Sequence, residues 1–113
     1  MKLIRSFGFA LKGIKVAFRE ELNIRIHVLA LIITIGAGIY FKITPIEWCF
    51  IFLASGFVFS LELINTAIEN LTDLVAPEKN SMAEKIKDVA AAAVLVSSIA
   101  ALLTGVIIFA KYL

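Results

Sequence analysis

Four apolar blocks follow one another along the chain, and the first differs from the others because charged residues run through it. Its bulky apolar residues are spaced three or four positions apart, on one face of a helix: Leu3, Phe7, Leu11, Ile14, Phe18 and Leu22. Lys12, Lys15 and Arg19 form a second, cationic stripe. We predict an amphipathic helix over about residues 3–22 that lies on a membrane surface, with packing against protein as the alternative.

The other three blocks are long and almost free of charge, as membrane-spanning helices are. We predict spans at about residues 24–43, 46–68 and 88–110. From Ile26 to Phe41 only His27 can gain a charge near neutral pH. A helix over these residues covers only about 24 Å of the roughly 30 Å hydrocarbon core, so the first span must extend into its flanks. Thr44 and Pro45 then supply a short turn.

The second span is followed by residues that end one helix and start another. Its helix pattern continues to about Asp73, and Pro77 disfavours helix at the residue before it. Ser81 and Glu84 have the spacing of a capping box at a helix start. The sequence therefore predicts a short loop over residues 74–81.

Composition supports a membrane protein and excludes an ordinary soluble domain. Of the 113 residues, 61% are hydrophobic and 18% charged, with a mean hydropathy of +0.98. A soluble domain of this size needs a large polar surface, because small folds bury only about two-thirds of their chain surface. The single cysteine, Cys49, excludes an internal disulfide. We expect one domain over residues 1–113, an all-α membrane protein with a surface helix and three spans.

Basic residues predict the orientation of the spans. Nine of the eleven lysines and arginines precede the first span or lie between the second and third, and only Lys42 and Lys111 do not. The positive-inside rule therefore places the N-terminus and the 74–81 loop in the cytoplasm and the C-terminus outside. No soluble surface combines a basic stripe with aromatic residues, so nucleic acid is not an expected partner.

Acidic residues gather on the same side of the membrane, with Glu47 as the exception among nine. Glu62, Asn65, Glu69 and Asp73 are spaced three, four and four, so they project from one helix face within about 60° of each other. An ionised Glu62 at membrane depth costs several kcal/mol unless it is partnered or used. A polar seam between helices would explain Asn65, but repelling carboxylates favour a cation site, for which Mg²⁺ is the natural candidate.

The ends of the three spans should converge at this face. Glu21 and Arg25 are four residues apart at the start of the first span, where they form either a surface salt bridge or part of a site. Lys87 and Asp88 start the third span. Phosphoryl transfer needs Mg²⁺, cations and a carboxylate beside the attacking hydroxyl, and this constellation could supply each part.

Other motifs add no further chemistry. No Walker A sequence is present, and Gly36 and Gly38 lack the context of a dinucleotide fingerprint, so we interpret them as packing residues. His27 has no second histidine to form a histidine-rich metal site, and interfacial hydrogen bonding and catalysis both stay open for it. Trp48 has the position of an aromatic interface anchor.

With these residues in place, the chain resembles the bacterial integral membrane diacylglycerol kinases, and among them the branch of undecaprenol kinases. The resemblance covers nearly the whole chain and is carried by Arg5-Ser6-Phe7, Gly13-Ile14, Glu21, Asn23 to His27, Glu47-Trp48, Glu62 to Glu69, Asp73, Lys87-Asp88 and Ala91 to Leu95. It implies a lipid kinase of the cytoplasmic (inner) membrane that uses ATP and Mg²⁺. It also implies a homotrimer with composite sites between subunits.

The resemblance further implies a role for each site residue. Glu62 would accept the proton of the lipid hydroxyl, and Glu21 and Glu69 would hold Mg²⁺ with ATP. Five residues would lie near the nucleotide: Glu78, Lys79, Asn80, Lys87 and Asp88. The lipid side of the site would comprise Asn23, Arg25, His27, Glu62 and Asn65.

Departures from the family pattern bear on the substrate. Phe9 stands where the diacylglycerol-specific branch has an aromatic hydroxyl near the nucleotide, and Ala91 stands where it has a serine near the lipid. Asn23 and His27 match the undecaprenol kinase branch, which favours undecaprenol over diacylglycerol and undecaprenyl phosphate over phosphatidic acid as the product. The alternative class is a small proton-coupled multidrug transporter with an intramembrane glutamate. Its usual four spans and midplane carboxylate oppose that interpretation.

Overall fold

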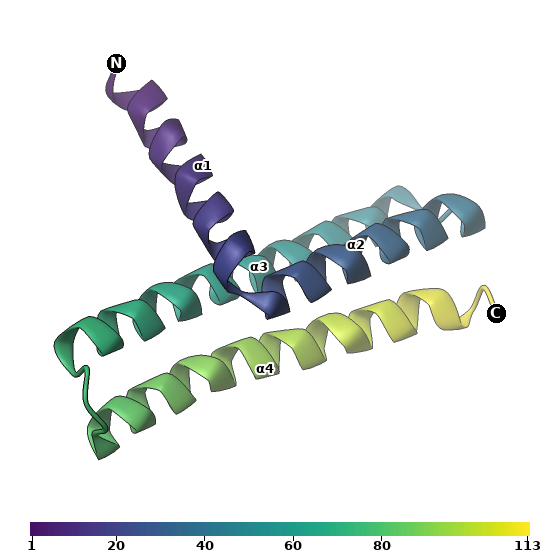
Figure 1. Cartoon of the computed structure of the whole chain (residues 1–113). Helices are drawn as coiled ribbons and strands as arrows, with labels where there is room; N and C mark the ends of the chain where they lie inside the picture. Colours follow the sequence, from purple (N-terminus) through teal and green to yellow (C-terminus); the bar gives the residue numbers. More distant parts are fainter.

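A computed structural model describes all 113 residues as four α-helices without a strand (Figure 1). The helices are α1 (Lys2–Glu20), α2 (Leu22–Phe41), α3 (Pro45–Val75) and α4 (Ser81–Ala110). By length and hydropathy, α2, α3 and α4 can each cross a membrane. The prediction of an all-α fold with a leading amphipathic helix and three spans is confirmed.

The two longest helices, α3 and α4, run antiparallel along most of their length (Figure 1). Helix α2 lies along the N-terminal half of α3, at the end of the bundle where α4 ends. Helix α1 leaves this bundle at a steep angle from its junction with α2. Every residue of α1 except Ala17 is exposed. An amphipathic helix with so little protein contact is suited to a membrane surface.

Backbone breaks define the ends of α1 and α2. Glu21 adopts an extended conformation (φ −111°, ψ 114°), which separates the two helices. Lys42 adopts the left-handed conformation (φ 52°, ψ 55°) and ends α2 at Phe41. The predicted boundaries of the first span, 24 and 43, were therefore each about two residues too late.

The loop between α3 and α4 is shorter than predicted, because α3 continues to Val75 and α4 starts at Ser81. The predicted cap of α4 was wrong by one residue. The side-chain oxygen of Asn80 accepts hydrogen bonds from the amides of Met82 and Ala83, at 2.8 and 3.1 Å, so Ser81 is already helical. A capping box does form elsewhere, between Thr44 and Glu47 at the start of α3.

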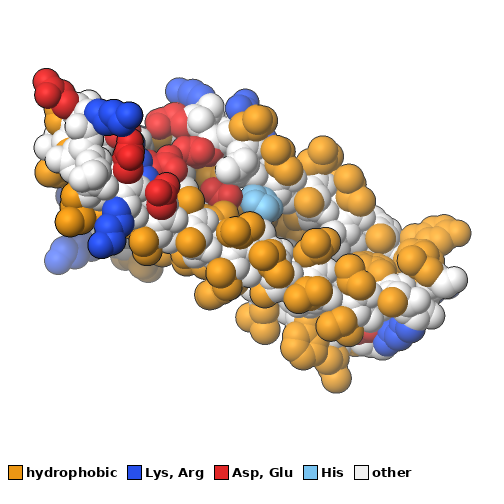
Figure 2. Space-filling model, turned by 90° about the horizontal axis from the view of Figure 1, so that it is seen from below, with side chains coloured by type: hydrophobic (Ala, Val, Ile, Leu, Met, Phe, Trp, Pro, Cys, Tyr) orange, Lys and Arg blue, Asp and Glu red, His pale blue; other side chains and the backbone are white.

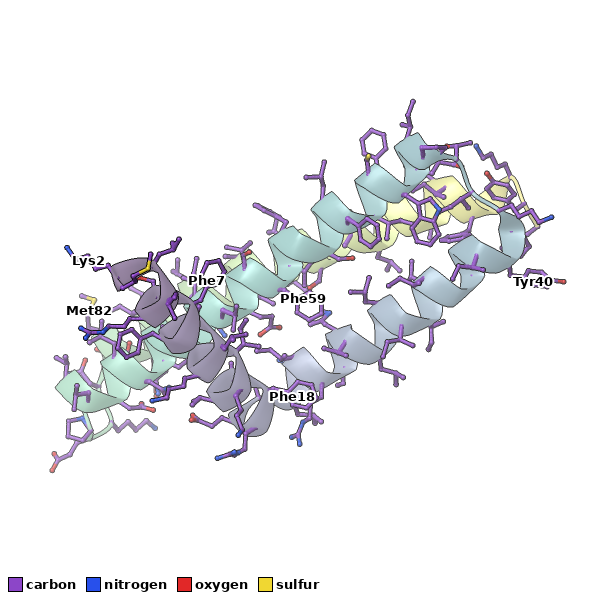
Figure 3. The ribbon with its side chains drawn as sticks, turned by 90° about the horizontal axis from the view of Figure 1, so that it is seen from above. Lys2, Phe7, Phe18, Tyr40, Phe59 and Met82 are labelled. Atoms are coloured by element: carbon purple, nitrogen blue, oxygen red, sulfur yellow. The ribbon has the colours of Figure 1, made fainter.

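The core of the chain is small and lies at the end that holds the α2–α3 turn. It comprises Ile43, Ile51 and Ile108, with Trp48 packed against it. A Cβ atom added to Gly38 would come within 2.6 Å of the Trp48 ring, so Gly38 is a packing residue as predicted. Trp48 is half-buried against protein, whereas Tyr40 projects from the far end of α2 (Figure 3). Most other large apolar side chains are exposed, as lipid-facing residues are.

Candidate active site

Charged side chains collect at one end of the bundle, which we call the acidic end. Figure 2 shows carboxylates running from this end toward the single histidine, beyond which the surface is almost entirely apolar. The α1–α2 junction supplies Glu21, and successive turns of α3 supply Glu62, Glu69 and Asp73. The structure thus brings together the predicted acids of the first and second spans.

Glu62 is the deepest of these carboxylates along α3 and the most completely buried. Its side chain is 1% exposed, and its Oε1 atom accepts no hydrogen bond. The nearest basic group is His27 on α2, whose Nε2 atom lies 3.3 Å from that oxygen. The histidine ring also meets the edge of Phe59, which projects from α3 on the side facing α2 (Figure 3). Glu62 therefore points into the interface between two helices rather than into lipid.

Asn65 extends the polar stripe by one turn. Its amide nitrogen donates a 3.2 Å hydrogen bond to Oε1 of Glu69, four residues later on the same helix face. Its own Oδ1 atom is buried without a partner. Oε1 of Glu62 and Oδ1 of Asn65 thus both lie buried without a hydrogen-bond donor. Such acceptors are uncommon in folded proteins.

Glu21 completes the cluster from the α1–α2 junction, where the extended backbone brings its side chain toward α3. Burial raises the pKa of the Glu21 carboxyl above its ordinary value of 4.5, and the negative charges of Glu69, Glu62 and Glu20 raise it further. Mutual repulsion of this kind is relieved when a cation binds between the carboxylates.

The carboxylates of this cluster suit Mg²⁺, but they do not form a metal site made of protein ligands alone. No group of three or more histidine, cysteine, aspartate or glutamate side chains is arranged to hold a metal ion. Mg²⁺ usually takes one or two carboxylates from the protein and completes its coordination with waters and substrate phosphates. Glu21 and Glu69 are two such carboxylates, from the α1–α2 junction and from α3.

Other predicted site residues lie outside this cluster. Asn23 and Arg25 are exposed, and Arg25 forms no ion pair with Glu21. Lys87 on α4 pairs with Asp73 on α3, so one predicted nucleotide residue is tied to the last acid of the stripe. The remaining three positions are exposed in the loop or on α4 and take part in no ion pair: Glu78, Lys79 and Asp88. Asn80 caps α4.

A cavity of about 350 Å³ begins at His27 and continues away from the acidic end between α2, α3 and α4. Its lining is mainly apolar, but each of these three helices contributes at least one hydroxyl: Thr34, Ser55, Ser98 and Thr104. Sequence reasoning missed this cavity, because the pattern along each helix does not reveal how the three helices pack against one another. His27, which contacts Glu62, is among the residues that line this cavity.

Sequence reasoning also missed a polar cluster at the opposite end of the bundle. Glu47 is buried there and contacts Lys111 at 2.7 Å and the Tyr112 hydroxyl at 2.6 Å. The Thr-x-x-Glu spacing of Thr44 and Glu47 was an available signal for this cap. The cluster is far from Glu62 along α3 and supports the fold rather than the candidate site.

Comparison with known proteins identifies the family. Residues 8–109 match the prokaryotic diacylglycerol kinases. The chain is 38% identical to an undecaprenol kinase of Bacillus subtilis over 108 residues, which cover 96% of this chain and 88% of that protein. It is 38% identical to a diacylglycerol kinase of Synechocystis over 104 residues, 91% of this chain and 59% of that protein.

A third relative, a diacylglycerol kinase of Escherichia coli (strain K12), is 25% identical over 107 residues, 95% of this chain and 88% of the relative. These matches give no support to the transporter alternative. They agree with the three apolar spans and with the acidic cluster at one end of the bundle. The chain therefore belongs to the prokaryotic diacylglycerol kinase family and is a membrane lipid kinase.

Proposed function

We propose that this lipid kinase transfers the γ-phosphate of ATP to the hydroxyl of undecaprenol and forms undecaprenyl phosphate. The relative named undecaprenol kinase is similar over almost the whole of both chains, which supports this substrate. Diacylglycerol, which would give phosphatidic acid, is the second candidate, because other relatives carry that name.

The observation that carries the proposal is the contact of the Glu62 carboxylate with His27, which lines the apolar cavity. A lipid alcohol that placed its hydrocarbon chain between α2, α3 and α4 would present its hydroxyl near His27 and Glu62. The free Oε1 atom of Glu62 can then accept the hydroxyl proton as the oxygen attacks the γ-phosphorus. Asn23, Arg25 and Asn65 would complete the lipid side.

Nucleotide binding would take place closer to the acidic end. Glu21 and Glu69 would hold Mg²⁺, which when bound would neutralise charge on the ATP phosphates. Lys87 and its neighbour Asp88 come directly before the uncharged part of α4. They would bind the nucleotide together with three residues of the preceding loop, Glu78, Lys79 and Asn80.

We infer an orientation in the cytoplasmic membrane with the N-terminus and the α3–α4 loop in the cytoplasm. Nine of the eleven basic residues lie on that side, and ATP is available there. A reporter fused after Leu113 should therefore read as external. A cytoplasmic signal at that position would contradict this orientation. If α4 alone were inverted, Lys87 and Asp88 would lie on the other side of the membrane from the other acids.

A homotrimer with sites shared between subunits is also proposed. Within one chain, Glu78, Lys79 and Asp88 are exposed and take part in no ion pair, which is consistent with a nucleotide site completed by a neighbouring subunit. Subunits that carry Glu62→Gln can be mixed in detergent with subunits that carry Asp88→Asn, because the proposal takes Glu62 and Asp88 of one site from different chains. Recovery of activity from two inactive preparations would support sites built from two chains, and no recovery would contradict them.

The central experiment offers the purified protein undecaprenol and diacylglycerol separately in mixed micelles at equal surface concentration. With labelled ATP and Mg²⁺, we expect faster phosphorylation of undecaprenol. A clear preference for diacylglycerol would overturn the substrate but not the kinase. Glu62→Gln is the matched control, since it keeps the side-chain shape and removes the proton acceptor.

A further inference from the structure

Glu62 has no direct route by which to lose a proton. Its side chain is 1% exposed, and the only nitrogen of a basic side chain within 4 Å of its carboxylate belongs to His27. The neighbouring hydroxyl of Thr66 is engaged, because it donates to the backbone carbonyl of Glu62. A carboxylate that takes one proton in each catalytic cycle must release it before the next cycle begins.

His27 contacts that carboxylate and is itself only partly buried. Nε2 lies 3.3 Å from Oε1 of Glu62, while 27% of the histidine side chain remains exposed. The edge contact with Phe59 limits the orientations of the ring. An imidazole, unlike a guanidinium, can both take up and release a proton.

We propose that His27 is a positioning and relay residue that acts through Glu62 by accepting its proton after phosphoryl transfer. This proposal rests on the proposed function, in which Glu62 takes the proton of the lipid hydroxyl. The lipid oxygen bonds to the γ-phosphorus, the bond from that phosphorus to the bridging oxygen breaks, and ADP leaves. The hydroxyl proton moves to Glu62, then to Nε2 of His27, and finally to water.

Other titratable groups around the pair are less suited to this step. Glu21 at the α1–α2 junction and Glu69 on α3 belong to the proposed cation site, and Glu69 already accepts a hydrogen bond from Asn65. Arg25 on α2 is a permanent cation and cannot accept a proton. On α4, no titratable side chain occurs between Asp88 and Lys111. The 3.3 Å separation is compatible with transfer, because such contacts commonly shorten when substrate binds.

The relay predicts a specific pH dependence. His27 can accept a proton only as neutral imidazole, so kcat should fall at acidic pH. His27→Gln retains a polar side chain that cannot titrate, and the acidic limb assigned to histidine should disappear from its profile. Persistence of the same limb in His27→Gln would assign it to another group and overturn the relay.

The decisive experiment separates the first turnover from later ones. With less ATP than enzyme sites, each site phosphorylates lipid at most once and need not reset Glu62. At saturating lipid, His27→Gln should lose much less of its first-turnover rate than of its steady-state kcat, which should fall about tenfold or more. Equal loss of both rates would indicate a structural role for His27 and contradict the proposal. An unchanged steady-state kcat would also contradict it. An unchanged kcat would mean that Glu62 passes its proton elsewhere, for instance to the product phosphate.

Chemical rescue provides the matched test. Imidazole in the buffer should raise the kcat of His27→Gln by about fivefold or more, and should not accelerate the wild type or Glu62→Gln. No rescue of His27→Gln would count against the relay. A wild-type protein that phosphorylates neither lipid alcohol, or a fully active Glu62→Gln variant, would instead overturn the proposed function itself, so the two failures are distinguishable.

Discussion

The hydroxyl of Tyr112 donates a 2.6 Å hydrogen bond to Glu47, a residue 65 positions earlier in the chain. The same carboxylate accepts from the backbone amide of Thr44 at 2.9 Å and lies 2.7 Å from Nζ of Lys111. One buried side chain thus caps α3 and holds the C-terminal end of α4 against the α2–α3 turn. This cluster secures the end of the bundle that is farthest from the acidic end.

We expect Tyr112→Phe to lower the thermal unfolding temperature and leave kcat unchanged. The hydrogen bond to Glu47 raises the pKa of Tyr112 above 10.0. A raised pKa means that the contribution to stability is complete below about pH 10 and is lost as the pH rises through the folded-state value. Melting curves should therefore show a steeper alkaline loss of stability in the wild type than in Tyr112→Phe. The control is Tyr40→Phe, because Tyr40 is 79% exposed.

A charge swap can separate the two roles of Lys87. Lys87 pairs with Asp73 across the α3–α4 connection, and it is also a proposed nucleotide residue. Asp73→Lys and Lys87→Asp should each lower the unfolding temperature, and the double variant should recover most of it because the pair is restored in reverse. The KM for ATP should stay raised in the double variant, since the cation has moved to α3. Recovery of both quantities would reduce Lys87 to a structural role.

Glu21 should couple pH to cation binding. Its pKa is raised by burial and by Glu69, Glu62 and Glu20, so protons compete with Mg²⁺ at this carboxylate at a higher pH than at an ordinary glutamate. The Mg²⁺ concentration for half-maximal MgATP binding should rise as the pH falls toward 5, and Glu21→Gln should weaken binding at every pH.

The same substitution should raise stability when Mg²⁺ is absent. A carboxyl whose pKa is raised on folding stabilises the fold only below its unfolded-state value, so the ionised Glu21 of neutral pH is destabilising. Removing its charge should increase the unfolding temperature of the metal-free protein by a few degrees. A lower unfolding temperature for Glu21→Gln would contradict this account. Glu20→Gln is the control, because Glu20 is exposed and lies outside the proposed cation site.

The sequence predicted what depends on spacing within one helix and missed what depends on packing between helices. Helical periodicity was sufficient to place Asn65 and Glu69 on one face, and their hydrogen bond follows from a separation of four residues. The contact of His27 with Glu62 depends on how α2 crosses α3, which no spacing along the chain encodes. The cap of α4 was misplaced because Asn80 and Ser81 are both good capping residues. The roles of the site residues stay predictions.

The cavity predicts how substrate choice can be changed. Gly105 lines it, and a Cβ atom built there meets no atom within 4 Å, so Gly105→Leu is a suitable substitution to add side-chain volume at the cavity. We expect this variant to slow phosphorylation of undecaprenol about tenfold, while a short-chain prenol is phosphorylated at close to its wild-type rate. Gly56→Leu is the control, because Gly56 is equally open but lies outside the cavity. Equal effects of the two variants would exclude the cavity as the binding site of the substrate's hydrocarbon chain.

The last prediction divides the carboxylates of α3 by their depth. Glu62 is buried beside His27, which lines the apolar cavity, and should act on the lipid hydroxyl, whereas Glu69, two turns closer to the acidic end, should act on Mg²⁺ and ATP. Glu62→Gln keeps the side-chain shape and removes the proton acceptor. Its kcat should fall about 100-fold or more, the scale that follows the loss of a general base, while MgATP binding is retained.

Glu69→Gln should show the opposite pattern, because it removes a cation ligand and leaves Glu62 beside the lipid. MgATP binding should weaken, and more Mg²⁺ should be needed for the activity that remains. Titration of Mg²⁺ and ATP against both variants in the same micelles measures each effect. If Glu62→Gln kept normal turnover, or lost MgATP binding as completely as Glu69→Gln, depth in the membrane would not determine the role of each carboxylate. The two acids would then serve one cation site together.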